Sequence, residues 1–437
     1  MEWYWAFALL LGMVISFMAL GVPVAFAFIA TNFIAVYIFT GFDAGALIQV
    51  ADNSTQLISR FILGPVPMFI LMGSLFFHTG LAIKVFDGLD AIFGRLPGRL
   101  CYLTVAGGSI FSTLTGSSMA NTAMLGSLMV PEMKRRGYSS QMSMGPILGT
   151  GGLAMIIPPS ALGVLLAAIA EIDVGRLLVA GFLPGFVLAA LYAGMITLQL
   201  IRYPGSAPAY DVEPMSWGTR ITLVITNILP MGLVVFMVVG FIVLGWATPT
   251  EAAACGVLGV FILAIAFRAL TFSSVSTSLE GTVRVGAMVF LIIMNSTVFS
   301  QMLSYSGASR GLIEWVTGYE LHRYMILFLM FCVLILLGMF MDATSMMLIT
   351  VPIFFPLAAA LEFDLIWYGL FVLITIEMAG TTPPFGLLLY VMLGVAPKGV
   401  TLFQVAKAAF PFLVCDAILI LILCAAPGLA LWLPSLM

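Results

Sequence analysis

The stretch of sequence that decides the fold is residues 100–131, LCYLTVAGGSIFSTLTGSSMANTAMLGSLMVP. Its 32 residues are mostly apolar, with an interruption at Gly116-Ser117-Ser118. They are too few for two membrane spans of about 20 residues each. Basic residues flank the stretch on both sides, namely Arg95, Arg99, Lys134, Arg135 and Arg136. Because positive charge marks the cytoplasmic side of a membrane, we predict a re-entrant hairpin with both ends inside and its tip at Gly116-Ser117-Ser118.

A second apolar stretch, residues 324–357, is also interrupted, by Gly338-Met339-Phe340-Met341-Asp342. Its neighbours are acidic rather than basic: Glu314, Glu320, Glu362 and Asp364. The opposite flanking charge predicts a second re-entrant hairpin that enters from the other face of the membrane.

Each predicted hairpin is followed by an apolar stretch with a Pro-Pro pair. Pro158-Pro159 lies within 142–170, and Pro383-Pro384 lies within 366–396. Proline removes a backbone donor, so both stretches are predicted to be broken helices. Chance spacing of Pro and Gly, or a simple kink in a packed helix, is the alternative.

In a bilayer, non-helical backbone occurs only where it is buried in protein or lines a cavity, and paired breaks mark a binding site near the midplane. We therefore predict two inverted repeats, 1–202 and 219–437, joined by a cytoplasmic linker, 203–218. This organisation is typical of a transporter.

The composition agrees with a membrane protein. Apolar residues make up 62% of the 437 residues, charged residues make up 8%, and the mean hydropathy is +1.18. We predict an all-α polytopic membrane protein. Amphipathic segments at 81–98 and 308–321 predict helices along the two membrane surfaces. The remaining apolar stretches are 3–40, 61–80, 177–201, 221–245, 252–267, 286–303 and 408–433.

Several classes of function are excluded by the same composition. The net charge is only −3 and there is no basic tail, so nucleic acid is not an expected partner. The five cysteines are isolated in apolar sequence, where they behave as small hydrophobes. No zinc-protease motif, nucleophile elbow or phosphate-binding loop is present, so we expect no enzymatic activity and no organic cofactor.

Polar residues at the interruptions are candidates for ligand binding. The N-terminal ends of half-helices attract anions, and unwound carbonyl groups suit Na⁺. Asp342 and Glu377 are the acidic residues deepest in apolar sequence. Burying a carboxylate in the membrane costs free energy, so both residues are candidates for a functional role. Asp342 lies beside a tip and is the stronger candidate, whereas Glu377 is either functional or hydrogen-bonded to a neighbouring helix. The other tip candidates are Ser112, Thr115, Ser117, Ser118, Asn121, Thr344 and Ser345.

The combined motifs resemble the large membrane subunit of the tripartite ATP-independent periplasmic (TRAP) transporters, the DctM-like family. The resemblance covers essentially the whole chain. The stretches that carry it are 116–121 (GSSMAN), 130–138 (VPEMKRRGY), 156–160 (IIPPS), 180–185 (AGFLPG), 338–342 (GMFMD), 351–353 (VPI) and 382–386 (TPPFG).

The resemblance implies an elevator-type fold of the ion-transporter superfamily in the bacterial inner membrane. It also implies Na⁺-coupled import of an organic acid such as a dicarboxylate, a sugar acid or a keto acid. Two partners are expected: a separate small four-helix membrane subunit and a periplasmic substrate-binding protein. The alternative is a stand-alone Na⁺/carboxylate symporter of the same superfamily, which needs no binding protein.

The family's sites can be carried over by motif. One Na⁺ is expected between Ser112, Thr115, Ala154, Ile157 and Pro159, and another between Gly338, Ala379, Thr382 and Phe385. The implied substrate-binding residues are Ser117, Ser118, Asn121, Asp342 and Thr381. The chain departs from the family pattern at Asn121, where Asp is frequent, and at Ala154 and Ala379, where Gly is common.

Overall fold

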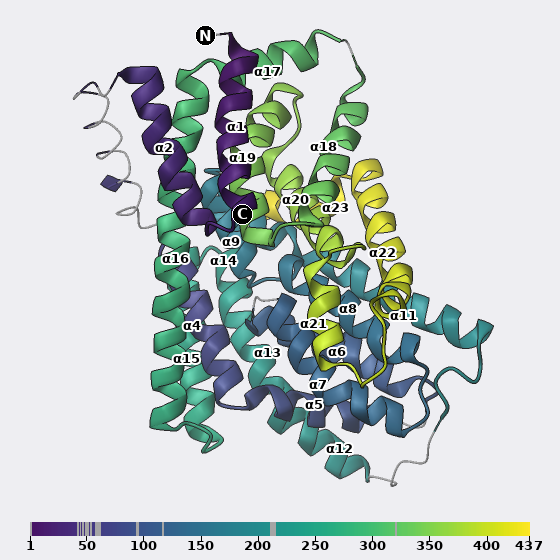
Figure 1. The fold of residues 1–437 in the computed structure, drawn as a ribbon. Helices are drawn as coiled ribbons and strands as arrows, with labels where there is room; N and C mark the ends of the chain where they lie inside the picture. Colours follow the sequence, from purple (N-terminus) through teal and green to yellow (C-terminus); the bar gives the residue numbers. More distant parts are fainter. Residues whose placement is uncertain are drawn as a thin grey trace.

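The computed structural model describes residues 2–41, 43, 45, 48, 52, 55–56, 63–92, 96–115, 118–209, 216–319 and 321–437. The regular elements in these ranges are all helical, without a strand (Figure 1). The prediction of an all-α membrane protein is therefore confirmed. Gly116, Ser117 and Glu320 lie outside the described residues, as does part of the predicted linker, 210–215.

The apolar stretch at 3–40 is two helices rather than one continuous element. Helix α1 (Trp3–Ala19) and helix α2 (Val24–Thr40) pack against each other. Gly21 has φ 83°, a left-handed conformation that ends α1, and Pro23 precedes the first residue of α2. The prediction of one stretch was wrong because it followed apolar composition and did not use Gly21 and Pro23, which indicate the end of one helix and the start of the next.

The first half contains the predicted helical pair and the predicted break. After α4 (Pro65–His78) and α5 (Leu81–Ile92), the pair is α6 (Arg99–Thr115) and α7 (Ser118–Arg135). Helices α8 (Ser140–Ile156) and α9 (Ala161–Ile169) meet at a 45° bend at Pro158-Pro159. Helices α10 (Val174–Ala180) and α11 (Phe182–Arg202) complete this half.

The second half begins with a helical run that includes two π-helical turns and ends in a further helix. The run consists of α12 (Trp217–Leu223), η2 (Val224–Ile228), α13 (Leu229–Val235), η3 (Phe236–Gly240) and α14 (Phe241–Val243). Helix α15 (Pro249–Ala266) follows. Residues 203–209 of the predicted linker are not helical, and α12 begins at its other end.

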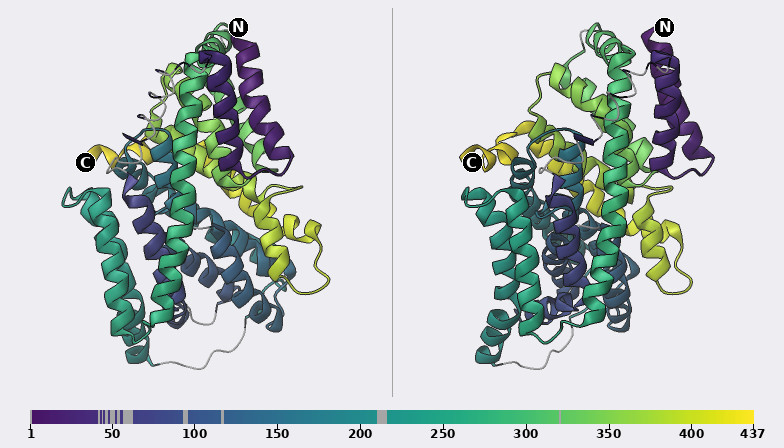
Figure 2. Two further views of the ribbon diagram at one scale, coloured as in Figure 1. Left: turned by 60° about the vertical axis from the view of Figure 1, so that its left-hand side comes forward. Right: turned by 90° about the vertical axis from the view of Figure 1, so that its left-hand side faces the viewer.

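Helix α16 (Phe272–Tyr305) has 34 residues and runs along most of the length of the molecule (Figures 1 and 2). It is longer than the predicted stretch 286–303. The Thr271 and Ser274 side chains and backbones cap each other reciprocally, which starts the helix about four turns earlier than apolar sequence alone indicates.

The rest of the chain repeats the order of the first half. Helix α17 (Ala308–Thr317) precedes the pair α18 (Arg323–Gly338) and α19 (Ala343–Ala360), and then the broken pair α20 (Leu365–Thr381) and α21 (Leu387–Val395). The chain ends with α22 (Leu402–Ala425), α23 (Gly428–Leu431) and η4 (Pro434–Leu436). Helices α5 and α17 lie at opposite ends of the molecule (Figure 1). The division into inverted repeats stays a prediction.

Six described helical segments are long and apolar enough to cross a membrane, or up to eight if each bent pair counts as one span. Four shorter apolar helices, α1, α2, α18 and α20, have 16 or 17 residues each. The chain is therefore a multi-pass membrane protein.

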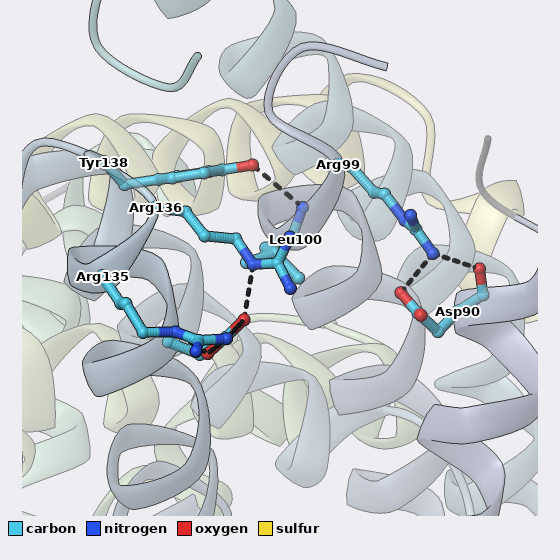
Figure 3. A network of polar contacts seen from close by, with 7 residues as sticks. Asp90, Arg99, Leu100, Arg135, Arg136 and Tyr138 are labelled. Carbon is cyan, nitrogen blue, oxygen red and sulfur yellow. Dashed lines mark hydrogen bonds and ion pairs between the residues drawn. The ribbon is translucent and has the colours of Figure 1, made fainter. Parts of the chain in front are cut away.

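The base of the first helical pair is fixed by polar contacts (Figure 3). Arg99 at the start of α6 is 3% exposed, and its Nη2 donates to the Asp90 backbone carbonyl and to Asp90 Oδ1, each at 2.6 Å. At the end of α7, Arg135 and Arg136 both donate to the Glu132 carboxylate. Three of the basic residues that flank this helical pair in sequence, Arg99, Arg135 and Arg136, are thus held close to acidic partners at its base.

Candidate functional site

The helical pairs and the breaks surround a cavity of about 510 Å³. Its wall comes from α4, α7, α9 and α16, and from the α18–α19 and α20–α21 junctions. The wall is mainly apolar. Its charged or hydroxyl-bearing residues in the described part of the chain are Ser74, His78, Ser118, Asp342, Thr344 and Glu377.

Four helices begin at this cavity. Their first two residues line it in each case: Ser118 and Met119 of α7, Ala161 and Leu162 of α9, Ala343 and Thr344 of α19, and Leu387 and Leu388 of α21. The first turn of a helix carries N–H groups without intrahelical partners and the positive end of the helix dipole. The cavity is therefore a favourable environment for an anionic group.

Three of these helix starts, those of α9, α19 and α21, differ in their caps. Gly163 N of α9 donates to Ser160 Oγ at 3.0 Å. Thr344 N and Ser345 N of α19 donate to Asp342 Oδ2 at 3.0 and 3.2 Å, and Ser345 Oγ donates to Asp342 Oδ1. Helix α21 follows Gly386 and has no side-chain cap. Its N–H groups are thus more available to a ligand than those of α9 and α19.

Among the predicted substrate-binding residues, Ser118 and Asp342 line the cavity. Asn121 and Thr381 are buried and are not part of its lining. Asn121 Nδ2 donates to the Thr150 carbonyl at 2.9 Å, and Thr381 Oγ1 donates to the Glu377 and Met378 carbonyls. Ser117 lies outside the described residues.

The first predicted Na⁺ position falls at the end of α8. Ala154, Ile157 and Pro159 are all buried around the break. Ile157 is extended, with φ −76° and ψ 121°, so the carbonyls of the last turn of α8 no longer have successive helical partners. Ser112 and Thr115 belong to the last turn of α6, but their side chains lie outside the described part of the structure.

The second predicted Na⁺ position falls where α18 meets α20. A Cβ built on Gly338 would lie 2.4 Å from Ala379 Cβ, so the end of α18 packs directly on α20. Thr382 Oγ1 donates to the Met378 carbonyl at 2.5 Å, and the ring of Phe385 lies 5.4 Å from that of Phe340. Backbone carbonyls and one hydroxyl are the oxygen donors that this region offers.

Two cavity residues were missed or undervalued from sequence. His78, at the end of α4, has its Nδ1 2.8 Å from the Ser74 carbonyl, and no motif marks it. Glu377 was left open between a functional and a structural role. Ser118 Oγ donates to Glu377 Oε2 at 2.9 Å across 259 residues of sequence, so the carboxylate is both part of the wall and a link between distant helices.

An all-helical, multi-pass bundle with helices broken around a central cavity is the architecture of a membrane transporter. The family described as "Tripartite ATP-independent periplasmic transporter, DctM component" matches residues 11–429. The chain belongs to this family, and it is a multi-pass protein of the inner membrane. The resemblance found in the sequence is confirmed.

Individual relatives cover nearly the whole chain. It is 29% identical to the C4-dicarboxylate TRAP transporter large permease protein DctM of Rhodobacter capsulatus, over 98% of this chain and 99% of the relative. It is 26% identical to the ectoine TRAP transporter large permease protein TeaC of Halomonas elongata, over 97% of each. These relatives are named as permeases, which supports a non-enzymatic role.

A solved structure shares the fold. The Alcanivorax borkumensis YdaH transporter aligns with a TM-score of 0.63 over 90% of this chain and 89% of that chain, with 13% identity. At this identity the likeness shows the fold alone.

Proposed function

We propose that this chain is the large transmembrane subunit of a binding-protein-dependent secondary transporter that imports an organic acid. The observation that carries the proposal is the convergence of four helix N-termini on one cavity of about 510 Å³. The N–H groups and dipoles of these helices stabilise a carboxylate without a neighbouring Arg or Lys.

The substrate carboxylate is proposed to bind at the start of α21, with the start of α7 opposite. Helix α21 lacks a side-chain cap, whereas the Asp342 carboxylate already accepts the first N–H groups of α19. His78 is the one basic side chain among the described residues of the wall, and when protonated it adds a positive charge there. The relatives named for C4-dicarboxylates and for ectoine both take substrates with a carboxylate, which supports a carboxylate-bearing substrate for this chain.

We also propose that Na⁺ is the coupling ion. Hard cations prefer oxygen ligands, and the ends of α8 and α18 and the break after α20 supply carbonyl and hydroxyl oxygens close to the cavity. Na⁺ bound at the two predicted positions would hold the broken helices in the arrangement that presents the α7 and α21 N-termini to the substrate. No group of three or more His, Cys, Asp or Glu side chains that could hold a metal ion exists in the described residues.

Transport is proposed to follow an elevator mechanism, in which the helical pairs and broken helices move together past the rest of the bundle. A separate small membrane subunit and a periplasmic binding protein are proposed as partners, because the family is one component of a tripartite system. The alternative is a stand-alone Na⁺/carboxylate symporter. It has the same cavity and ions but takes its substrate directly from solution.

Reconstitution tests these proposals together. The chain and its small subunit would be placed in proteoliposomes, and uptake of labelled dicarboxylates, sugar acids and ectoine would be measured with an inward Na⁺ gradient. Uptake that needs both Na⁺ and the binding protein supports a binding-protein-dependent tripartite transporter. Uptake without the binding protein supports the stand-alone symporter. Uptake that does not depend on the Na⁺ gradient contradicts the proposed coupling to Na⁺.

A further inference from the structure

A cluster of buried polar atoms lies beside the cavity, where α7, α8 and α20 meet. Thr122 is fully buried, Glu377 is 3% exposed and Ser118 is 5% exposed. Ser118 and Thr122 are one helical turn apart on α7, whereas Glu377 comes from α20. None of the predicted Na⁺ ligands belongs to this cluster.

Two oxygens of the cluster have no hydrogen-bond partner in the described part of the structure, namely Glu377 Oε1 and Thr122 Oγ1. The other carboxylate oxygen, Glu377 Oε2, accepts a hydrogen bond from Ser118 Oγ at 2.9 Å. A buried carboxylate with one donor, next to a buried hydroxyl with none, is an unfavourable arrangement unless something else occupies the space between them.

Gly151 on α8 defines that space. A Cβ built on Gly151 would lie 2.9 Å from Thr122 Oγ1, 3.4 Å from Glu377 Oε1 and 3.7 Å from the Ser118 carbonyl oxygen. A carboxylate, a hydroxyl and a main-chain carbonyl therefore converge on one point beside α8. The absence of a side chain at residue 151 leaves this point open.

The occupant has to supply positive charge. Helix α8 has no charged residue, and the charged residues of α7 are Glu132, Lys134 and Arg135 in its last turns, about 20 Å along the helix from Ser118. Asp416 of α22 lines a small pocket with Glu377 and is itself acidic. Glu377 thus has no cationic side chain from α7 or α8 to neutralise it.

We propose that Glu377 Oε1, Thr122 Oγ1 and the Ser118 carbonyl form a further Na⁺-binding position, distinct from the two positions at the breaks. Three oxygens from two helices suit a small hard cation. A proton on Glu377 would not satisfy Thr122, because these two oxygens do not hydrogen-bond to each other. The bound ion would neutralise Glu377 and connect the start of α7, at the cavity wall, to α20.

This inference rests on the proposed Na⁺ coupling, and its test separates the two. The full chain with its small subunit would be purified in nanodiscs, and the number of ²²Na⁺ ions bound per chain would be measured by equilibrium dialysis at constant ionic strength with choline. Glu377→Gln and Thr122→Val are each expected to bind one Na⁺ fewer than the unmodified chain. Thr122→Ser, which keeps the hydroxyl, is expected to bind the full number.

Thr375→Val is the matched control. Thr375 is also fully buried, but its hydroxyl donates to the Phe371 carbonyl within α20, so this variant should keep every Na⁺. If Glu377→Gln does not fold, the Thr122→Val and Thr122→Ser pair decides. An unchanged Na⁺ number in the Val variant overturns the additional position but leaves the proposed coupling intact. An unmodified chain that binds no Na⁺ overturns both.

Discussion

The two Pro-Pro breaks are alike in sequence, yet they differ in what covers them. Residues 151–160, which contain the first break, are all buried, whereas Pro383, Pro384 and Phe385 of the second break are exposed. Gly181, between α10 and α11, packs against the first break, since its Cβ would lie 2.0 Å from the Ile156 carbonyl oxygen. The second break is packed mainly against itself, through Gly386 and the Gly380 and Thr382 carbonyls. A local motif therefore determines where a helix breaks, and distant residues determine whether the break is open.

The largest expected effect comes from disturbing the cover of the first break. Gly181→Ala would place a methyl group 2.0 Å from a backbone oxygen, which a rotamer change cannot relieve. We expect a loss of about 3 kcal/mol or more in the free energy of unfolding, measured by thermal unfolding of the purified protein in detergent.

Gly194→Ala on α11 is the matched control for Gly181→Ala. A Cβ at Gly194 would meet nothing within 4 Å, and alanine favours a helix over glycine by about 1 kcal/mol. This variant should be unchanged or slightly stabilised. Equal unfolding midpoints for the two variants would contradict the close packing of Gly181 on the first break.

Helices α11 and α22, which lie further along the chain from the two breaks, are joined by a buried hydrogen bond. Tyr192 of α11 donates to Asp416 Oδ1 of α22 at 2.5 Å, and both side chains are buried. Tyr192→Phe leaves the Asp416 carboxylate without this donor, so we expect a loss of about 1–3 kcal/mol.

A double-mutant cycle with Tyr192→Phe and Asp416→Leu sharpens this prediction. Because Leu needs no donor, adding Tyr192→Phe to Asp416→Leu should cost much less than the same change in the unmodified chain. Additive losses would show that the hydrogen bond does not couple the two halves.

At the second predicted tip, the Asp342 carboxylate caps the helix that follows it, α19. Asp342→Ala removes the acceptor of the Thr344 and Ser345 N–H groups, which should cost about 1 kcal/mol and abolish substrate uptake without unfolding the protein. Asp342→Asn keeps a side-chain oxygen for the cap and should retain most of the uptake. An Asn variant with unchanged stability and no uptake would show that the charge is needed, and retained uptake in the Ala variant would remove Asp342 from the site.

The sequence predicted the helical class, the interruption between α18 and α19 and both Pro-Pro breaks, because Gly and Pro act on the backbone locally. The first predicted tip, at Gly116 and Ser117, lies outside the described residues. The prediction failed at 3–40, where Gly21 and Pro23 divide an apolar stretch into two helices. The partner of Glu377 could not be predicted either, because Ser118 is brought to it only by packing of α7 against the rest of the bundle. The same limit applies to the convergence of four helix N-termini, which depends on tertiary arrangement rather than on any residue pattern.

Chemical accessibility is the most direct test of the difference between the two breaks. The substitutions that it needs are expected to have the smallest effect on stability. In a cysteine-free background, Phe385→Cys should react readily with a water-soluble thiol reagent, because Phe385 is 49% exposed. Ile157→Cys should react slowly, because Ile157 is 5% exposed beneath Gly185. Substrate and Na⁺ would then be added: protection of residue 385 with no change at residue 157 would show that the second break alone opens and closes. Equal labelling of the two positions would mean that the first break is as accessible as the second. The packing of Gly181 and Gly185 over the first break would then not persist in the membrane protein.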